Sequence, residues 1–206
     1  CICGVQIARP DGVAEYIGCD ALILACNGFG GNPAMVQAHI PDMGSALYFG
    51  HQGNQGDAIN WGQALGAATR HLGAYQGHGS VAEPHGILIS WALMMQGGLQ
   101  INRDGKRFSN EHSGYSEQAR RVIAQPSGFA WNLFDDRLLD LGRGFEDFRQ
   151  AEALGALQSA PTIPALAKMI SVPAAQLAET LGLVVGYATL QQLDAFGRDF
   201  SQHPIL

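Results

Sequence analysis

One stretch of the chain concentrates side chains that could take part in acid–base chemistry. Residues 97–115 read GGLQINRDGKRFSNEHSGY. The alternation over 99–101 predicts a short strand, and the residues that follow predict a tight turn with Gly105 at a positive φ. A second strand over 106–108 would pair back as a hairpin and deliver four polar residues to one place: Asn110, Glu111, His112 and Tyr115. An ordinary surface hairpin with polar flanks explains the same spacing, because Asn-x-x-Gly turns are common.

Size and composition indicate a globular protein. The chain has 206 residues, of which 47% are hydrophobic and 15% charged, which excludes a disordered chain. A net charge of −6 without a basic stripe argues against a nucleic-acid partner. No apolar run is long enough to span a membrane, and no signal peptide is visible.

The cysteines and the chain ends carry two further expectations. The 4 cysteines all precede residue 27 and fit no common zinc spacing, so we expect free thiols in a reducing cytoplasm and no metal. Cys1 already falls in a predicted strand, and no closing element is recognisable at the other end. We therefore expect the sequence to be a fragment.

The first third of the chain alternates predicted strands with glycine-rich loops. Strands over 1–7 and 13–17 flank an Asp-Gly turn, and the apolar run 19–26 predicts a strand buried on both faces of a parallel sheet. Two glycine-rich loops follow, at 27–32 and 50–58, and each opens a predicted helix, the first at Asn32-Pro33. Such loops let the backbone approach a ligand. A connector without a ligand, with Asp57 serving only as an N-cap, is the alternative.

The stretch that ends at Tyr115 also carries a family resemblance. It resembles the N-x-x-G-x-R-F-x-N-E signature of the flavoproteins that include soluble fumarate reductases, succinate dehydrogenase flavoprotein subunits and 3-ketosteroid dehydrogenases. The matching residues are Asn102, Gly105, Arg107, Phe108, Asn110 and Glu111. The resemblance implies an α+β (α/β) fold, in which part of an FAD-binding Rossmann-like domain (1–50) is followed by a fumarate reductase-type capping domain (51–206).

Both glycine-rich loops resemble loops of the same family that lie against FAD. The first matches at Ala25, Gly28, Phe29, Gly30 and Asn32; the second matches at Gly53, Gly56, Asp57, Ile59, Gly66 and Ala67. Cys26 and Asn27 depart from the family pattern, although asparagine tolerates left-handed geometry. The resemblance thus implies FAD as cofactor, with Ala25, Gly28, Gly30, Gly56 and Asp57 as binding residues.

Later segments continue the resemblance. Gln76-x-His78 is placed as the family places a pair whose histidine helps bind substrate, which implies Gln76, His78, Asn110 and Glu111 as substrate-binding residues. A strand is expected over 128–134, and capped amphipathic helices are expected near 162–167 and 172–181. Residues 190–200 resemble a further helix of the cap with its D-x-x-F-G-R run.

The family chemistry is hydride exchange with a flavin, and the residue that moves the partner proton divides the family. Fumarate reductases use an arginine where this chain has Tyr115, and relay charges where it has Trp91 and Met94. Ketosteroid dehydrogenases have a tyrosine base at that position. The resemblance therefore implies Tyr115 as the catalytic residue. A tyrosine ionises near pH ~10, so it needs nearby donors or positive charge, for which His78 and His112 are candidates.

Our preferred interpretation is a fragment of an FAD-dependent oxidoreductase that performs α,β-dehydrogenation next to a carbonyl, or the reverse ene reduction, with an electron acceptor or donor of unassigned chemistry. One alternative is reduction of an unsaturated acid such as fumarate, with Arg120 or Arg121 replacing the missing arginine. Another is a non-catalytic binding module with the same fold. The family's Gly-x-Gly-x-x-Gly fingerprint is absent from these residues, so we expect the isolated chain to bind FAD poorly and to be inactive.

Overall fold

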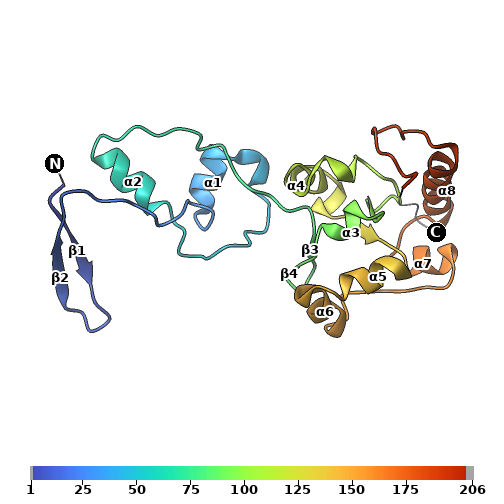
Figure 1. Cartoon of the computed structure of the whole chain (residues 1–206), viewed down its shortest axis with the longest axis horizontal. Helices are drawn as coiled ribbons and strands as arrows, with labels where there is room; N and C mark the ends of the chain where they lie inside the picture. The colour runs from blue at the N-terminus through green and yellow to red at the C-terminus, as the bar shows by residue number, and fades with distance from the viewer. Residues whose placement is uncertain (1, 203–206) are drawn as a thin grey trace. The chain divides into compact units, whose positions relative to one another are not determined.

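The computed structural model describes residues 2–202, and the chain divides into two compact units with the boundary after Ala74 (Figure 1). This boundary falls later than residue 50 because the second glycine-rich loop is bonded to the first. The amide of Gly56 donates to the Gly28 carbonyl at 3.1 Å, and the amide of Gly31 donates to the Asn54 carbonyl at 2.9 Å. Both loops therefore belong to the first unit.

The first unit begins with the expected hairpin. Strand β1 (Gly4–Ala8) pairs antiparallel with β2 (Ala14–Gly18), with Val5 opposite Ile17. Gly12 at the turn has φ 82°, a conformation that glycine adopts without steric cost. The prediction of this hairpin is confirmed, except that Cys1 lies outside the described residues. Cys3, Cys19 and Cys26 are free thiols.

The buried parallel strand predicted over 19–26 is wrong. The segment has no assigned helix or strand and joins no ladder, and Ile23 is 89% exposed. A strand buried on both faces needs a hydrogen-bonded neighbour and a covering layer on each face. Among residues 2–202 no strand pairs with this segment.

Two helices of the first unit begin where glycine-rich sequence ends. Helix α1 (Pro33–His39) has Asn32 as N-cap, whose side chain accepts from the Met35 amide, as predicted. A 3-10 turn, η1 (Pro41–Met43), follows. Helix α2 (Asp57–Ala64) is capped by the backbone of Gly56 at φ 87°, with no side-chain cap. Asp57 is therefore the first helical residue, and the interpretation of it as an N-cap is wrong.

The second unit holds two small antiparallel sheets. Strand β3 (Val81–Ala82) pairs with β4 (Ile87–Leu88), and β5 (Leu99–Ile101) pairs with β6 (Trp131–Leu133), which lies within the strand predicted over 128–134. The turn after β5 forms as predicted, with Gly105 at φ 77° and its amide donating to the Asn102 carbonyl at 3.0 Å. The predicted return strand over 106–108 is wrong. Its place beside β5 is taken by β6.

Helices are the main secondary structure of the second unit. They are α3 (Ala92–Met95), α4 (Tyr115–Ile123), α5 (Asp136–Gly142), α6 (Glu146–Ala153), α7 (Ile163–Met169) and α8 (Ala174–Leu190), with the 3-10 turns η2 (Glu111–Ser113) and η3 (Pro126–Gly128). The helices predicted near 162 and 172 are confirmed, and Thr162 caps α7. The helix expected over 190–200 is wrong, because Leu193 bridges to Asp199 around a turn at Gly197.

Two hydrophobic clusters support this unit. One joins β5 and β6 to α7 and α8 through Leu99, Leu133, Ala167 and Leu177. The other joins β4, α3, α5 and α6 through Ile87, Leu93, Leu138 and Phe148. The mixed helix and small-sheet architecture agrees with the expected α+β class. Within residues 2–202, every helix is too short or too polar to cross a membrane.

Candidate active site

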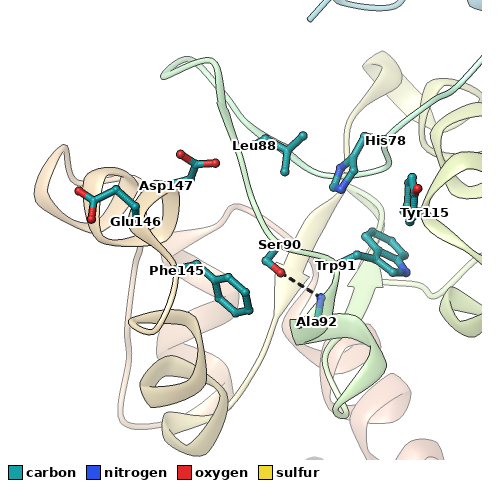
Figure 2. Close-up of a pocket in the computed structure, with 9 residues that line it drawn as sticks. All are labelled: His78, Leu88, Ser90, Trp91, Ala92, Tyr115, Phe145, Glu146 and Asp147. Atoms are coloured by element: carbon teal, nitrogen blue, oxygen red, sulfur yellow. Dashed lines mark hydrogen bonds between the residues drawn. The ribbon is translucent and has the colours of Figure 1, made fainter.

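A pocket of about 450 Å³ opens in the second unit where β4, α3, α4 and α6 approach one another (Figure 2). Figure 2 shows His78, Trp91 and Tyr115 gathered on one side of it and the start of α6 on the other. The lining residues are His78, Leu88, Ser90, Trp91, Ala92, Tyr115, Phe145, Glu146 and Asp147. The pocket thus contains two residues that the sequence predicted, His78 and Tyr115.

Tyr115 meets the Gln76-x-His78 segment directly. The Gln76 side chain donates from Nε2 to the Tyr115 hydroxyl at 2.5 Å. The rings of His78 and Tyr115 lie 5.2 Å apart with an interplanar angle of 30°, and His78 meets Trp91 edge-on at 6.0 Å. The structure therefore brings together three expected site residues that the sequence separates by up to 39 positions.

Alternating glycines bring this segment onto α4. The Gly77 amide donates to the Ser116 hydroxyl at 3.0 Å, and the Gly79 amide donates to the Tyr115 carbonyl at 3.0 Å. A Cβ on Gly77 would lie 2.6 Å from the Cβ of Ala119, and one on Gly79 would lie 2.9 Å from the side chain of Gln118. Glycine is thus required at both positions for the backbone to lie this close to the helix.

Replacing Gly77 with alanine is expected to push the segment away from α4. Overpacking of this kind costs about 1–3 kcal/mol, and it separates Gln76 from Tyr115. Thermal unfolding measures the first effect and turnover of the full-length protein the second. Gly182→Ala is the matched control, because a Cβ there meets no atom within 4 Å and alanine favours the helix by roughly 0.5–1 kcal/mol. A Gly77→Ala protein as stable and active as the wild type would contradict the packing argument.

A buried amide network stands behind the segment. Gln100 donates from Nε2 to the Gly79 carbonyl and to Asn132 Oδ1, both at 2.8 Å. Asn132 donates to the Ser80 hydroxyl at 2.6 Å, and Gln118 donates to Gln100 Oε1 at 2.9 Å. Because buried polar networks are costly when any member loses its partner, these bonds hold the wall of the pocket in one arrangement.

Two residues of the signature, Asn102 and Asn110, fix the backbone of the segment that precedes Tyr115. Asn102 Oδ1 accepts from the amides of Asp104 and Lys106, which closes the turn. The side chain of Asn110 accepts from the His112 amide at 2.9 Å and so caps η2. Neither residue lines the pocket. The resemblance implied that Asn110 binds substrate; in the structure its side chain caps η2.

Glu111 lies in a buried four-residue ion-pair network. Its side chain is 1% exposed and accepts from Arg107 at 2.6 Å and from Arg198 at 2.8 Å. Arg107 also pairs with Asp194. The Glu111 carboxylate accepts a further hydrogen bond, at 2.9 Å, from the backbone N–H of Gln100. Burial opposes ionisation of Glu111, but the Arg107 hydrogen bond and the charges of Arg107 and Arg198 outweigh it and hold its pKa below the ordinary value.

This network favours a structural role for Glu111 over the substrate-binding role that the resemblance implied. The carboxylate oxygens are taken up by Arg107, Arg198 and the Gln100 amide, and Glu111 does not line the pocket. Sequence reasoning missed Arg198 as a partner of Glu111 and Asp194 as a partner of Arg107. Both lie in the short segment 194–198. Burial of opposite charges so far apart in sequence leaves no local pattern to detect.

The two histidines proposed as helpers differ in position. Burial lowers the pKa of His78, against a smaller opposing effect from its hydrogen bond with Ser80, so the ring is neutral at pH 7. The Nδ1 atom of His78 lies 3.1 Å from the Ser80 carbonyl oxygen. His112 turns away, with Nε2 3.2 Å from the Met94 carbonyl oxygen, and it does not line the pocket.

Trp91 and Met94 stand where fumarate reductases have charged proton-relay residues, and the two side chains have different surroundings. Trp91 is a wall of the pocket, and its indole nitrogen donates to the Glu111 carbonyl at 3.2 Å. Met94 is 1% exposed and belongs to the hydrophobic core. Arg120 and Arg121 do not line the pocket, and Arg121 donates to the Asn110 carbonyl at 3.3 Å.

The start of α6 forms a wall that the sequence did not predict. Phe145, Glu146 and Asp147 line the pocket opposite His78 and Tyr115 (Figure 2). No sequence signal connects this segment to Tyr115, because their proximity depends on packing of Phe148 and Ala151 in the second hydrophobic cluster. Among the lining residues there is no lysine or arginine.

The glycine-rich loops of the first unit fit a nucleotide cofactor. A Cβ on Gly28 would meet no atom within 4 Å, so its backbone faces open space, and Asn27 has the left-handed φ of 64° that asparagine tolerates. Gly30 and Gly56 serve close packing instead, because a Cβ there would lie 2.2 Å from Tyr48 and 2.5 Å from Met35. Asp57 is exposed at the start of α2, where its carboxylate can accept hydrogen bonds from ligand hydroxyl groups.

Comparison with known proteins agrees with this architecture. A family model described as an FAD binding domain matches residues 2–192. The chain is 29% identical over 182 residues to a probable fumarate reductase of Shewanella frigidimarina, covering 88% of the chain and 30% of that relative. It is 28% identical over 179 residues to a 4-oxocyclohexanecarboxylate 2-dehydrogenase of Sinomonas cyclohexanicum, covering 79% of the chain and 30% of that relative.

Solved structures resemble the whole chain. The open conformation of a flavocytochrome c3 fumarate reductase superposes with a TM-score of 0.71 at 26% identity, covering 98% of this chain and 36% of that one. A 3-ketosteroid delta1-dehydrogenase of Sterolibacterium denitrificans has a TM-score of 0.67 at 21% identity, covering 98% of this chain and 41% of that one, and shows the fold alone. This chain spans about a third of the length of these proteins.

Proposed function

Because the chain belongs to the FAD binding domain family, we propose that it forms part of an FAD-dependent oxidoreductase that dehydrogenates a neutral ketone next to its carbonyl. The observation that carries this proposal is the composition of the pocket around Tyr115. Its aromatic walls are Trp91 and Phe145, its histidine is neutral, and its charged members are Glu146 and Asp147. An apolar ketone can pack against these aromatic walls. A dicarboxylate would be repelled by the carboxylates of Glu146 and Asp147 and would find no lysine or arginine among the lining residues.

The two units take separate parts in this proposal. The first unit contributes to the cofactor site through Ala25, Gly28, Gly30, Gly56 and Asp57, which form or flank the bonded glycine-rich loops. The second unit is the substrate-capping part and contains the pocket. When bound, FAD supplies the acceptor for the hydride that leaves the substrate. The three free cysteines of the described residues support our proposal of a reducing, cytoplasmic location, which fractionation of the host cell would test.

Tyr115 takes the proton in this scheme. Its oxygen removes a proton from the carbon next to the carbonyl, and the electron pair of that C–H bond forms the new double bond. Gln76 contacts the same oxygen at 2.5 Å. The His78 ring lies beside the phenol ring, with centroids 5.2 Å apart, and Trp91 meets His78 edge-on. The reverse reaction uses the same residue as proton donor.

A pair of substrates with the same ring but different charge tests this function in the full-length parent protein. Without oxygen, we expect the methyl ester of 4-oxocyclohexanecarboxylate to bleach the visible flavin bands faster than the free acid at the same concentration. The two compounds share one ring and differ in charge, so the comparison isolates the pocket's electrostatics. Oxidation of the reduced flavin by fumarate, with no bleaching by either ketone, would instead support reduction of unsaturated acids. A protein purified without flavin would overturn the enzymatic proposal.

A further inference from the structure

We infer that Gln76 is the positioning residue for Tyr115, holding the phenol oxygen with its side-chain amide so that the oxygen can accept a substrate proton. The inference rests on the proposed function of Tyr115. It replaces the substrate-binding role that the resemblance implied for Gln76. The contact that carries it is the 2.5 Å hydrogen bond from Nε2 to the hydroxyl.

The chemistry of the two groups sets the direction of the effect. An amide NH₂ group donates and does not accept, so the phenol oxygen is the acceptor in this bond. A phenolate is a stronger acceptor than a phenol, so the bond favours the ionised form that acts as a base. With the amide on one side, the proton of the neutral hydroxyl must point elsewhere.

The contact is built into the backbone. On one side of Gln76, the Gly77 amide is held by the Ser116 hydroxyl, and Ser116 directly follows Tyr115 in α4. Two residues further, the Gly79 amide is held by the Tyr115 carbonyl itself. These backbone hydrogen bonds fix Gln76 and Tyr115 relative to each other. Little conformational entropy is therefore lost when the Gln76 amide bonds to the Tyr115 hydroxyl.

Among the residues that the structure describes, no lysine or arginine lines the pocket beside Tyr115. His78 is neutral at pH 7 because burial lowers its pKa, and Glu146 and Asp147 from α6 carry the wrong sign. On α4 itself Glu117 is acidic, and Arg121 donates to the Asn110 carbonyl. From η2, Glu111 turns to Arg107 and Arg198, and His112 turns to the Met94 carbonyl. Gln76 is the residue whose side chain donates a hydrogen bond to the Tyr115 hydroxyl.

The test uses the full-length, FAD-loaded protein and the pH dependence of kcat/KM with the neutral keto ester. Gln76→Leu removes the donor, and we expect kcat to fall about 10- to 100-fold at neutral pH, as for loss of a hydrogen bond to a charged group. The pH at which kcat/KM is half-maximal should move upward, with activity partly recovered in alkali. Gln76→Glu should move it further, because a carboxylate repels a phenolate. Gln96→Leu, at an exposed glutamine of the same unit, is the control.

The outcomes separate this role from others. A rise in KM with unchanged kcat and an unchanged pH profile would overturn the inference in favour of substrate binding. Loss of activity with lowered thermal stability would assign Gln76 a structural role. If no ketone is turned over, the proposed function fails but the pair is still tested. The ultraviolet phenolate signal of Tyr115, obtained by subtracting the Tyr115→Phe titration, should then appear at higher pH in Gln76→Leu. An unshifted signal would refute the coupling.

Discussion

Tyr115→Phe is expected to reduce ketone dehydrogenation by the full-length protein at least about 100-fold, because a positioned acid or base contributes roughly 10²–10⁴-fold to such reactions. The loss should appear in kcat more than in KM, since the ring and its contacts with His78 remain. Single-turnover bleaching of the flavin bands measures it directly.

Stability should be nearly unaffected by the same change. Gln76 is exposed, so its amide is hydrated when the hydroxyl is removed. Equal melting temperatures and flavin contents would therefore localise the effect to chemistry. Tyr16→Phe provides the matched control, because Tyr16 lies on β2 and is 76% exposed. A Tyr115→Phe enzyme with full turnover would remove Tyr115 from the mechanism.

Glu111→Gln should produce the largest loss of stability. Arg107, Glu111, Asp194 and Arg198 have side chains no more than 6% exposed, and their two positive charges balance two negative ones. Removing one carboxylate leaves an uncompensated buried cation, which costs about 3–5 kcal/mol. Denaturant unfolding of the full-length protein measures the change.

A matched pair of variants distinguishes this effect from a general loss of fold. Adding Arg198→Met to Glu111→Gln removes the unpaired cation, so the double variant should recover part of the lost stability. Glu152→Gln breaks the exposed pair with Arg143 and should change stability far less, because exposed pairs contribute little. Similar losses from Glu111→Gln and Glu152→Gln would contradict the argument from burial.

The network also predicts how stability depends on pH. The pKa of Glu111 in the folded protein lies below its ordinary value of 4.5. The unfolded chain therefore binds the proton first as pH falls, so the stabilisation is complete above that ordinary value and is lost as pH drops through the folded-state pKa. The Glu111→Gln protein should lack this component, which unfolding measured across acidic pH would reveal.

Local features of this fold were predictable because they depend on residues a few positions apart. Asn32 before Pro33 caps a helix, Thr162 caps another, and Asn102 with Gly105 closes a turn, all as expected. The family could also be recognised, because its signature is a set of such local requirements with fixed spacing. The match over residues 2–192 confirms that recognition.

Failures arose where an element depends on a distant partner. Alternation in 99–101 and 106–108 suggested that the two segments pair, but β5 pairs with β6 some thirty residues later, with Gln100 opposite Asn132. The apolar run 19–26 has strand composition but no ladder partner among residues 2–202. Which strand pairs with which depends on all the strand edges that the fold brings together, and the composition of one segment does not specify its partner.

The sequence by itself determined the turns, most helix starts and the family, and it named Tyr115 as the residue that we propose for proton transfer. Only the tertiary structure decided what those residues touch. It placed Gln76 against Tyr115, gave Glu111 a counter-ion 87 positions away, and brought α6 to the pocket. Hydrogen bonds and ion pairs act over a few ångströms, so residues distant in sequence acquire partners only when packing brings them together.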